Sequence, residues 1–187
     1  MDHTQASRGG PSQPPTAVGL HVYQLNMCHD SMCLVLLVQH LATHSVDVLL
    51  LQDPPEGLVS KVDCPTGYKL YLPSTDFTPQ TCSAPPLVAI LVRSTLRARA
   101  IPFSHPCVCG IFVSTSRRPL ALVSAYIHHS DGLGLEALAS LVTIAHRSTP
   151  LLLVGADANG HSPWWGPPDT RTNIVGAQVE EFILNSH

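Results

Sequence analysis

The chain has 187 residues, of which 44% are hydrophobic and only 12% are charged, so it can fill the core of one ordinary domain. Thirteen acidic residues against ten basic ones give a formal net charge of −3, which excludes the strongly basic class of nucleic-acid-binding proteins. No apolar run approaches the roughly 18 residues that cross a bilayer, and the start lacks the basic and apolar regions of a signal peptide. We therefore expect an intracellular protein with no membrane partner.

The beginning of the chain differs in composition from the rest. Residues 1–18 are rich in Pro, Gly, Ser and Gln, which predicts a disordered leader before a single domain at 19–187. The hydrophobic patterns and turn signals that follow indicate a strand, a helix, a strand and a turn, at 21–26, 31–45, 46–53 and 54–57.

The middle third alternates short β-rich runs with Pro, Gly and Ser breaks. This pattern predicts one multi-stranded, mostly antiparallel sheet with strands at 68–74, 87–94, 97–103, 109–115 and 119–127. The last third then reads as a helix at 134–148, a buried strand at 150–159 and an amphipathic helix at 173–187. That last helix has apolar residues at helical spacing, at Val175, Val179, Phe182 and Ile183.

Four of the predicted strands end in a polar side chain: Asn26, Asp53, Tyr126 and Asp157. Any one of these residues alone would be ordinary, since asparagine commonly caps a helix and aspartate before proline is common in turns. Ligands in α/β proteins are met at the carboxyl ends of strands, so the set of four favours a site there.

The residue types at these strand ends suit cleavage of a phosphodiester. Mg²⁺ needs one or two carboxylate or amide oxygens together with the phosphate of the substrate, and Asp53 and Asn26 can supply them. Asp157 can orient or deprotonate a water molecule. Asn159 lies two residues further on the same side of an extended strand, and can donate a hydrogen bond to the charge that builds on the phosphate.

Other residues near these strands have two interpretations. His161 is either part of the site or an ordinary loop residue. Trp165 either stacks on a base or packs its loop onto the core. Arg117 and Arg118 belong to the only basic grouping of the chain, and they either contact nucleic acid or are simply solvated on a hairpin.

The order of these motifs resembles a known family. The segment GADANGHSPWWG, followed by TNIVG, is similar to the G-D-x-N-A-H-x-x-W-G and N-x-x-G segments of the endonuclease/exonuclease/phosphatase superfamily, and QLN and SAY precede it in the same order. Within that superfamily the chain resembles, from about Leu20 onward, the apurinic-type endonuclease domain of non-LTR (LINE-type) retrotransposon polyproteins.

The resemblance implies an α/β fold in the form of a four-layer α/β/β/α sandwich, with two sheets face to face and helices outside. It implies that Asn26 lies next to the metal, Tyr126 contacts the phosphate, Asp157 positions the attacking water and Asn159 stabilises the phosphate. We assign His161 to the same catalytic group. We predict that Trp165, Asn173 and the two arginines bind the nucleic acid.

The implied function is Mg²⁺-dependent (or Mn²⁺-dependent) nicking of DNA that leaves a 3′-hydroxyl to prime reverse transcription. The implied partners are DNA and a downstream reverse transcriptase domain of the same polyprotein, in the nucleus. Two rival functions stay open: a phosphatase or deadenylase of the same fold, and a catalytically degenerate remnant or binding module.

Two departures from the family pattern bear on activity. Asp53 stands in LQDPP where the family has glutamate, so its carboxylate is one methylene shorter. The chain also ends before the family's closing S-D-H segment. We therefore expect the second sheet to lack its C-terminal strands and to leave a strand edge unpaired. This chain alone should then nick DNA poorly or not at all, and one longer by a few tens of residues should nick it.

Overall fold

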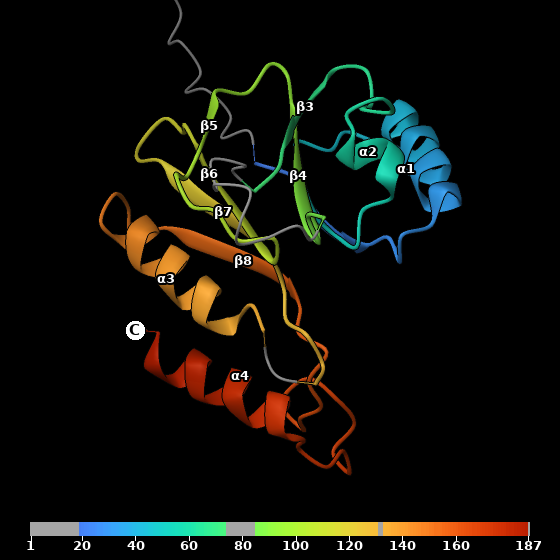
Figure 1. The fold of residues 1–187 in the computed structure, drawn as a ribbon. Coiled ribbons are helices and arrows are strands. Elements are labelled where there is room, and N and C mark those ends of the chain that lie inside the picture. Colours follow the sequence, from blue (N-terminus) through green and yellow to red (C-terminus); the bar gives the residue numbers. More distant parts are fainter. Residues whose placement is uncertain (1–18, 74–84, 131–132, 187) are drawn as a thin grey trace, which may run out of the picture.

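Two four-stranded sheets form the centre of the protein in the computed structural model, which describes residues 19–73, 85–130 and 133–186 (Figure 1). The predicted leader at 1–18 lies outside the described residues. The first sheet has the order β1-β2-β4-β3, with bounds Val22–Asn26, Val48–Gln52, Val88–Arg93 and Tyr68–Tyr71. The second has the order β5-β6-β7-β8, with bounds Ala98–Ala100, Val108–Val113, Leu120–Tyr126 and Leu152–Asp157. The helices are α1 (Ser31–Thr43), α2 (Glu56–Val59), α3 (Leu135–His146) and α4 (Ile174–Asn185).

Each sheet contains one parallel pair, and in both cases a helix makes the crossover. Strands β1 and β2 are parallel and joined through α1, and β7 and β8 are parallel and joined through α3. The other pairs are antiparallel. A parallel pair needs a long connection, which a helix provides. As a result, the carboxyl ends of β1 and β2 lie next to each other in the first sheet, and those of β7 and β8 lie next to each other in the second.

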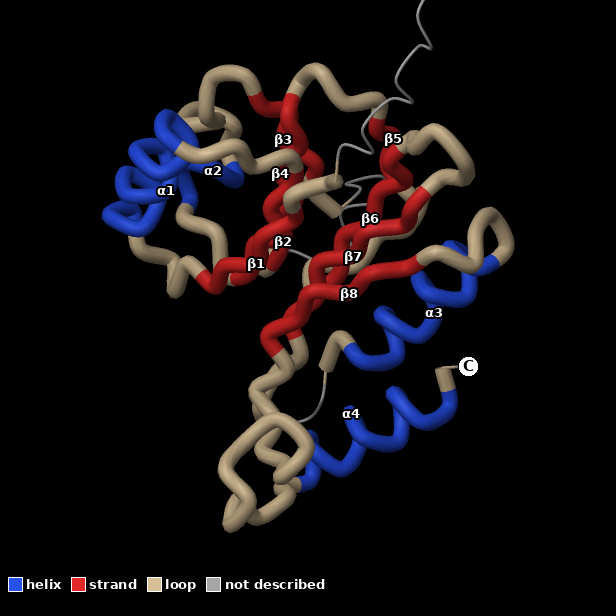
Figure 2. Tube along the Cα trace, turned by 180° about the vertical axis from the view of Figure 1, so that it is seen from behind, coloured by secondary structure: helices blue, strands red, loops and turns tan. Residues whose placement is uncertain are grey.

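The sheets stack face to face, with α1 and α2 outside the first and α3 and α4 outside the second (Figures 1 and 2). Three apolar clusters fill the spaces between these four layers. Strand β2 is buried along its whole length because its side chains alternate between two of the clusters. Leu49 and Leu51 pack in the cluster with α1, whereas Leu50 packs between the sheets against residues of the second sheet. The predicted four-layer α/β/β/α sandwich is thus confirmed.

The middle strands are antiparallel, as predicted, but they do not form one sheet. Strands β3 and β4 belong to the first sheet, and β5, β6 and β7 belong to the second. The chain changes sheets in the short turn between Arg93 and Ala98. Alternation of apolar residues identifies a strand without saying which sheet it joins, so the sequence could not show this division. The predicted turn at 54–57 leads directly into α2, which begins at Glu56.

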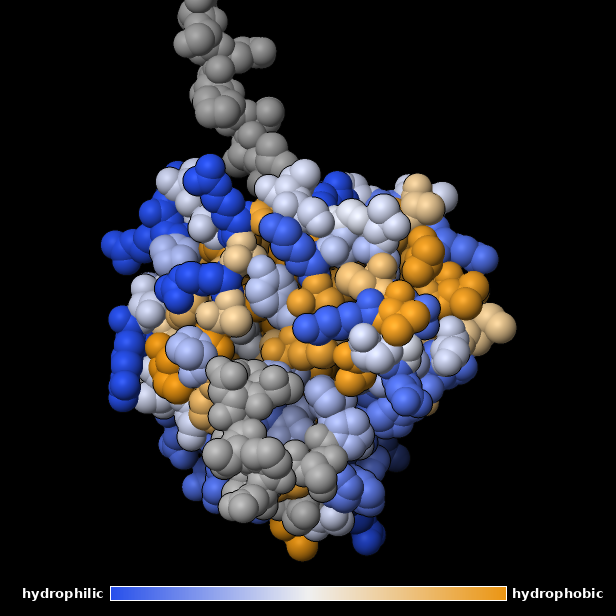
Figure 3. Space-filling view, turned by 45° about the horizontal axis from the view of Figure 1, so that its top comes forward, coloured by the Kyte–Doolittle hydropathy of each residue, from blue (hydrophilic) through white to orange (hydrophobic). Residues whose placement is uncertain are grey.

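Strand β8 is not the buried strand that its run of leucines predicts. It lies at the end of the second sheet and, within the described residues, pairs only with β7. Consequently Leu153 is 44% exposed and Leu151, just before the strand, is 47% exposed. Further apolar surface appears over α1, on the right in Figure 3, where Met32 and Leu36 are exposed. No helix in the described part of the chain is long and apolar enough to cross a membrane.

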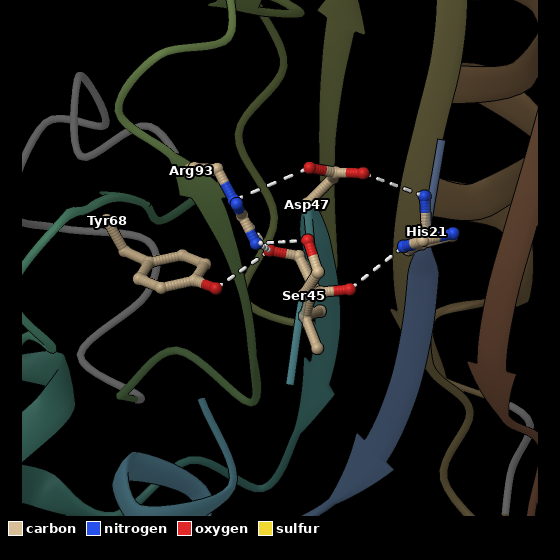
Figure 4. Close-up of polar contacts among 6 residues, drawn as sticks. His21, Ser45, Asp47, Tyr68 and Arg93 are labelled. Carbon is tan, nitrogen blue, oxygen red and sulfur yellow. Dashed lines mark hydrogen bonds and ion pairs between the residues drawn. The ribbon is translucent and has the colours of Figure 1, made fainter. Parts of the chain in front are cut away.

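A polar cluster fixes the end of the first sheet at which β1 and β2 begin (Figure 4). The carbonyl of Val46 accepts hydrogen bonds from Arg93 Nε at 3.0 Å, from Arg93 Nη2 at 2.8 Å and from the Tyr68 hydroxyl at 2.7 Å. Asp47 accepts from the backbone N–H of His21 at 2.9 Å and lies 3.4 Å from Arg93 Nε. These contacts attach the connection between α1 and β2 to residues of β3 and β4 and to the residue before β1. They fix the positions of these strands at the end of the sheet opposite to Asn26 and Asp53.

A buried hydrogen-bond network ties the two sheets together close to the carboxyl end of β2. The amide nitrogen of Gln52 donates to Ser124 Oγ at 2.9 Å, and Ser124 Oγ donates to the Leu51 carbonyl at 2.8 Å. Both side chains are completely buried. We expect Ser124→Ala to destabilise the protein by about 1–3 kcal/mol, because the Gln52 amide keeps only the Gly155 carbonyl, at 3.3 Å.

Urea denaturation measures this loss. Ser148→Ala, at an exposed serine after α3, is the control and should stay within about 0.5 kcal/mol of the wild type. Equal stability of the Ser124 variant and the control would show that the network contributes nothing.

Candidate active site

The structure brings Asn26, Asp53, Tyr126 and Asp157 together at the carboxyl ends of β1, β2, β7 and β8. Tyr126 and Asp157 are register partners in the second sheet, and Asn26 is the register partner of Gln52, which precedes Asp53. The amide nitrogen of Asn26 donates to Asp157 Oδ2 across the two sheets. The two sheets thus place a pair of carboxylates and an amide in one location.

The backbone at these strand ends adopts a conformation that costs energy. The described residues include five non-glycine positions with positive φ, and four of them follow these strands: Cys28, His29, Asp53 and Asn159. Left-handed backbone costs an L-residue about 1–2 kcal/mol. Such residues persist where the surrounding structure holds them, and they gather at functional sites. Their concentration here independently marks this edge as the candidate site.

Asp53 is a largely buried carboxylate, with a side chain only 14% exposed. Burial raises the pKa of Asp53, and the negative charge of Asp157 raises it further. His29 and the Asn26 side chain act in the opposite direction on this pKa. The net effect is a raised pKa, so the ionised form of Asp53 is less stable in the protein than in water. A bound cation would stabilise that ionised form.

The raised pKa of Asp53 gives a testable dependence of stability on pH. A raised pKa means that the folded protein ionises this carboxyl less readily than the unfolded chain, so ionisation costs stability as pH rises through that pKa. We expect Asp53→Asn, in the absence of metal, to melt at a higher temperature than the wild type at neutral pH. This advantage should shrink as pH falls and Asp53 becomes protonated in the wild type.

Melting curves between acidic and neutral pH measure the effect. Asp169→Asn removes an exposed acid of the same charge and should show no such pH-dependent advantage. A lower melting temperature for the Asp53 variant at neutral pH would contradict the prediction.

The side-chain amide of Asn159 is a buried donor that lies near the Tyr126 hydroxyl. Its backbone N–H donates to Asp157 Oδ1 at 3.3 Å, but its side-chain Nδ2 is buried without a hydrogen-bond partner among the described residues. A buried donor left unpaired costs about 1–3 kcal/mol. Such a donor, on the residue whose backbone N–H binds Asp157, is suited to an acceptor from outside the protein, such as a phosphate oxygen.

Tyr126 presents its hydroxyl to the same location. Burial raises the pKa of Tyr126, and the charges of Asp53 and Asp157 raise it further, while the amide of Asn159 acts in the opposite direction. The hydroxyl therefore stays protonated at neutral pH and is available as a hydrogen-bond donor.

The loop after β8 forms one wall of an open pocket of about 550 Å³, which is lined by Asp157, Asn159, His161, Trp165 and His129 among others. Trp165 is half-exposed, and its indole nitrogen donates to the Gly160 carbonyl at 2.8 Å. His161 is exposed, and its backbone is bound to Asn173. The pocket is thus lined both by Asp157 at the carboxyl end of β8 and by the accessible side chain of Trp165.

Of the residues predicted on the nucleic-acid side, Asn173 caps a helix beside the pocket, and the two arginines lie far from it. Asn173 caps α4: its side-chain oxygen accepts from the backbone N–H groups of Gly176 at 2.7 Å and His161 at 3.0 Å. Arg117 and Arg118 lie in the turn before β7, at the opposite end of that strand from Tyr126. Seven residues of strand span about 20 Å, so these arginines are remote from the site. The sequence shows that they are basic but not at which end of the sheet they lie.

Two histidines near the site were not among the predicted residues. His29 lies 3.4 Å from Asp53 Oδ1, and His129 lines the pocket and stacks loosely on His128. Both follow a strand that ends in a predicted site residue, by three positions in each case. This shared position, three residues after a predicted site residue, is the feature of the sequence that could have identified both histidines.

The donor set fits a weakly held divalent cation. The described residues contain no group of three or more His, Cys, Asp or Glu side chains that could hold a metal. Mg²⁺ is commonly held by one or two carboxylates, with water and substrate phosphates completing its shell, and Asp53 can serve as that carboxylate. The Asn26 side-chain oxygen accepts from the Cys28 backbone N–H at 2.8 Å and its nitrogen faces Asp157. Its role as an oxygen ligand therefore stays a prediction.

Among solved structures, the chain is similar to the endonuclease domain of TRAS1, a telomere-specific non-LTR retrotransposon. The TM-score is 0.69 and the sequence identity 20%, over 90% of this chain and 71% of that one. The chain therefore has the same fold as that endonuclease domain.

Two further solved structures are similar to the chain in fold. D. rerio TDP2 complexed with single-strand DNA product has a TM-score of 0.51 and 15% identity, over 77% of this chain and 62% of that one. A β-hairpin deletion mutant of β toxin from Staphylococcus aureus has a TM-score of 0.57 and 12% identity, over 90% of this chain and 72% of that one. No family model and no curated protein sequence matches the chain.

Proposed function

We propose that the chain carries the active site of a metal-dependent DNA endonuclease that hydrolyses phosphodiester bonds. The observation that carries the proposal is the buried Nδ2 of Asn159, which has no hydrogen-bond partner among the described residues, on a residue whose backbone N–H binds Asp157. Asp157 in turn lies close enough to Asp53 to raise its pKa. Two carboxylates and an unpaired donor suit a substrate that is itself anionic, brings acceptor oxygens and is bound together with a cation. A phosphodiester meets all three requirements.

Each residue of the site has a distinct task in this reaction. Asp157, held by the Asn26 amide and the Asn159 N–H, orients the attacking water and takes its proton. The Asn159 amide and the protonated Tyr126 hydroxyl donate to the phosphate oxygens as negative charge builds on them. A divalent cation held by Asp53 would neutralise charge on the phosphate and on the leaving oxygen.

DNA is the proposed substrate, and Trp165 the residue that stacks on a base. The support is the exposed indole at the rim of the pocket, together with two structures of the same fold. One is named as a retrotransposon endonuclease domain and the other is complexed with a DNA product. A downstream reverse transcriptase domain, target-site nicking for retrotransposition and a nuclear location belong to the same proposal.

The test is nicking of supercoiled plasmid under single-turnover conditions, by this chain and by the product of its complete reading frame. We expect the longer protein to nick with Mg²⁺ or Mn²⁺ and to stop when a chelator removes the cation, and we expect the 187-residue chain alone to nick poorly or not at all. Asn159→Asp, which removes the buried donor at equal size, should reduce nicking about 10²–10³-fold. Asn185→Asp makes the same change at an exposed position of α4 and should leave the rate unchanged.

The same preparations decide between the rival functions. Release of phosphate from a phosphomonoester without nicking would replace the endonuclease with a phosphatase, and shortening of poly(A) RNA from its end would replace it with a deadenylase. DNA binding with no turnover in either form of the protein would show a binding module. The departure of Asp53 from the family's glutamate is the observation that favours this last rival.

A further inference from the structure

The loop after β1 holds His29 against Asp53 through three contacts, and no step of the proposed reaction uses it. The backbone N–H of His29 donates to the Asp53 carbonyl at 2.8 Å. Its ring Nδ1 lies 3.3 Å from the Pro54 carbonyl oxygen, and its Nε2 lies 3.4 Å from Asp53 Oδ1. Both His29 and Asp53 have positive φ, so the backbone on each side is held in an unfavourable conformation that maintains this contact.

The contact with Pro54 determines which ring nitrogen is free. A carbonyl oxygen can only accept a hydrogen bond, so Nδ1 of His29 carries the proton. In the neutral ring Nε2 then has a lone pair directed at a carboxylate oxygen. Two acceptor atoms that face each other repel unless a donor or a cation lies between them, and a second ring proton or a metal cation can take that place.

The geometry suits a metal cation. Metal-bound histidines characteristically donate their other ring N–H to a backbone carbonyl or a carboxylate, which fixes the ring and its tautomer, and His29 does this with Pro54. Bonds of about 2.0–2.2 Å to a nitrogen and an oxygen, at tetrahedral or octahedral angles, separate these two atoms by about 3–3.5 Å. The observed 3.4 Å falls in this range. The His29 side chain is 58% exposed, so a cation can reach the pair from solvent.

We propose that His29 and Asp53 together bind the divalent cation, and that the imidazole makes the site prefer a first-row transition-metal ion such as Mn²⁺ over Mg²⁺. This inference rests on the proposed function, in which Asp53 is the metal ligand. Imidazole nitrogen suits transition metals, whereas Mg²⁺ is bound almost entirely by oxygen. His29 would also occupy a coordination position that the shorter aspartate leaves to water.

The test measures metal binding rather than turnover. The 187-residue chain is titrated with Mn²⁺ while electron paramagnetic resonance follows the free ion, and Mg²⁺ affinity is obtained by competition. Spin-echo modulation of the bound Mn²⁺ reports whether a nitrogen is coordinated. We expect a nitrogen signal and at least about tenfold tighter binding of Mn²⁺ than of Mg²⁺ in the wild type. Loss of even an outer-shell partner costs about 10–100-fold in affinity, so His29→Gln should lose the nitrogen signal and at least about tenfold in Mn²⁺ affinity.

His146→Gln is the control, since His146 is exposed in the last turn of α3; both properties should stay as in the wild type. Asp53→Ala should abolish binding of both ions. If His29→Gln keeps the nitrogen signal and the preference for Mn²⁺ while Asp53→Ala loses binding, the role of His29 is overturned and the metal-dependent function stands. Unchanged Mn²⁺ binding in Asp53→Ala would overturn the metal assignment of the proposed function itself.

Discussion

Replacing Asp157 with asparagine should slow DNA nicking by about 10²–10⁴-fold, the usual contribution of a positioned proton acceptor. The substitution keeps the size of the side chain and removes the basicity that a water molecule needs. The Asn26 amide and the Asn159 N–H bind different oxygens of Asp157, so the single oxygen of asparagine can accept from only one of them. Loss of that hydrogen bond costs about 0.5–1.5 kcal/mol, which the removal of the charge that raises the pKa of Asp53 offsets in part.

Plasmid nicking and Mn²⁺ affinity, measured on the same preparations, separate the possible roles of Asp157. We expect nicking to be lost and metal binding to be retained, and we expect Asp169→Asn, at an exposed acid of the same loop, to change neither. A variant that nicks at the wild-type rate would remove Asp157 from the reaction. Loss of metal binding together with nicking would make Asp157 a metal ligand instead.

Gly176→Ala should impair both folding and nicking, because the loop that carries Asn159 and His161 lies directly on the first turn of α4. A Cβ atom at residue 176 would come to 2.0 Å from the carbonyl oxygen of His161. The clash is between backbone groups, so no side-chain rotation relieves it. We expect a loss of at least about 1–3 kcal/mol. The folded fraction should also nick about 10²-fold more slowly, since a shift of about 1 Å in a catalytic group has that effect.

Thermal melting and nicking per folded molecule measure the two effects separately. Gly160→Ala is a milder test of the same contact, because its Cβ would come to 2.8 Å from the Gly176 nitrogen. Gly19→Ala, where a Cβ would meet nothing within 4 Å, should behave as the wild type. Unchanged nicking in both loop variants would show that the position of this loop does not matter for the reaction.

The sequence predicted where the site strands end more accurately than it predicted which strands share a sheet. Apolar runs that stop at Asn26, Asp53, Tyr126 and Asp157 are local patterns, and the structure has a strand ending at or immediately before each residue. The assignment of β3 and β4 to one sheet and β5 to the other depends on contacts between distant segments. Such contacts leave no periodic signal in the chain.

The roles of individual residues depended on context in the same way. The motif that contains Asn173 could be read from the sequence, but its function as the cap of α4 required knowing that His161 lies beside the helix. The contact of His29 with Asp53 arises because β1 and β2 are parallel neighbours and end together. The exposure of β8 reflects its position at the edge of the sheet, which its leucine-rich composition conceals.

The distribution of the site between the two sheets has a consequence for how the protein folds. Asn26, His29 and Asp53 come with the first sheet, whereas Tyr126, Asp157 and Asn159 come with the second or follow it. A partly folded chain in which only the first sheet has formed would already hold the cation ligands, yet it would have no group to activate water. In the proposed reaction, hydrolysis therefore requires that both sheets have formed and docked. The proposed nuclease would be inactive in nascent chains that hold only the first sheet, and in chains whose two sheets have separated.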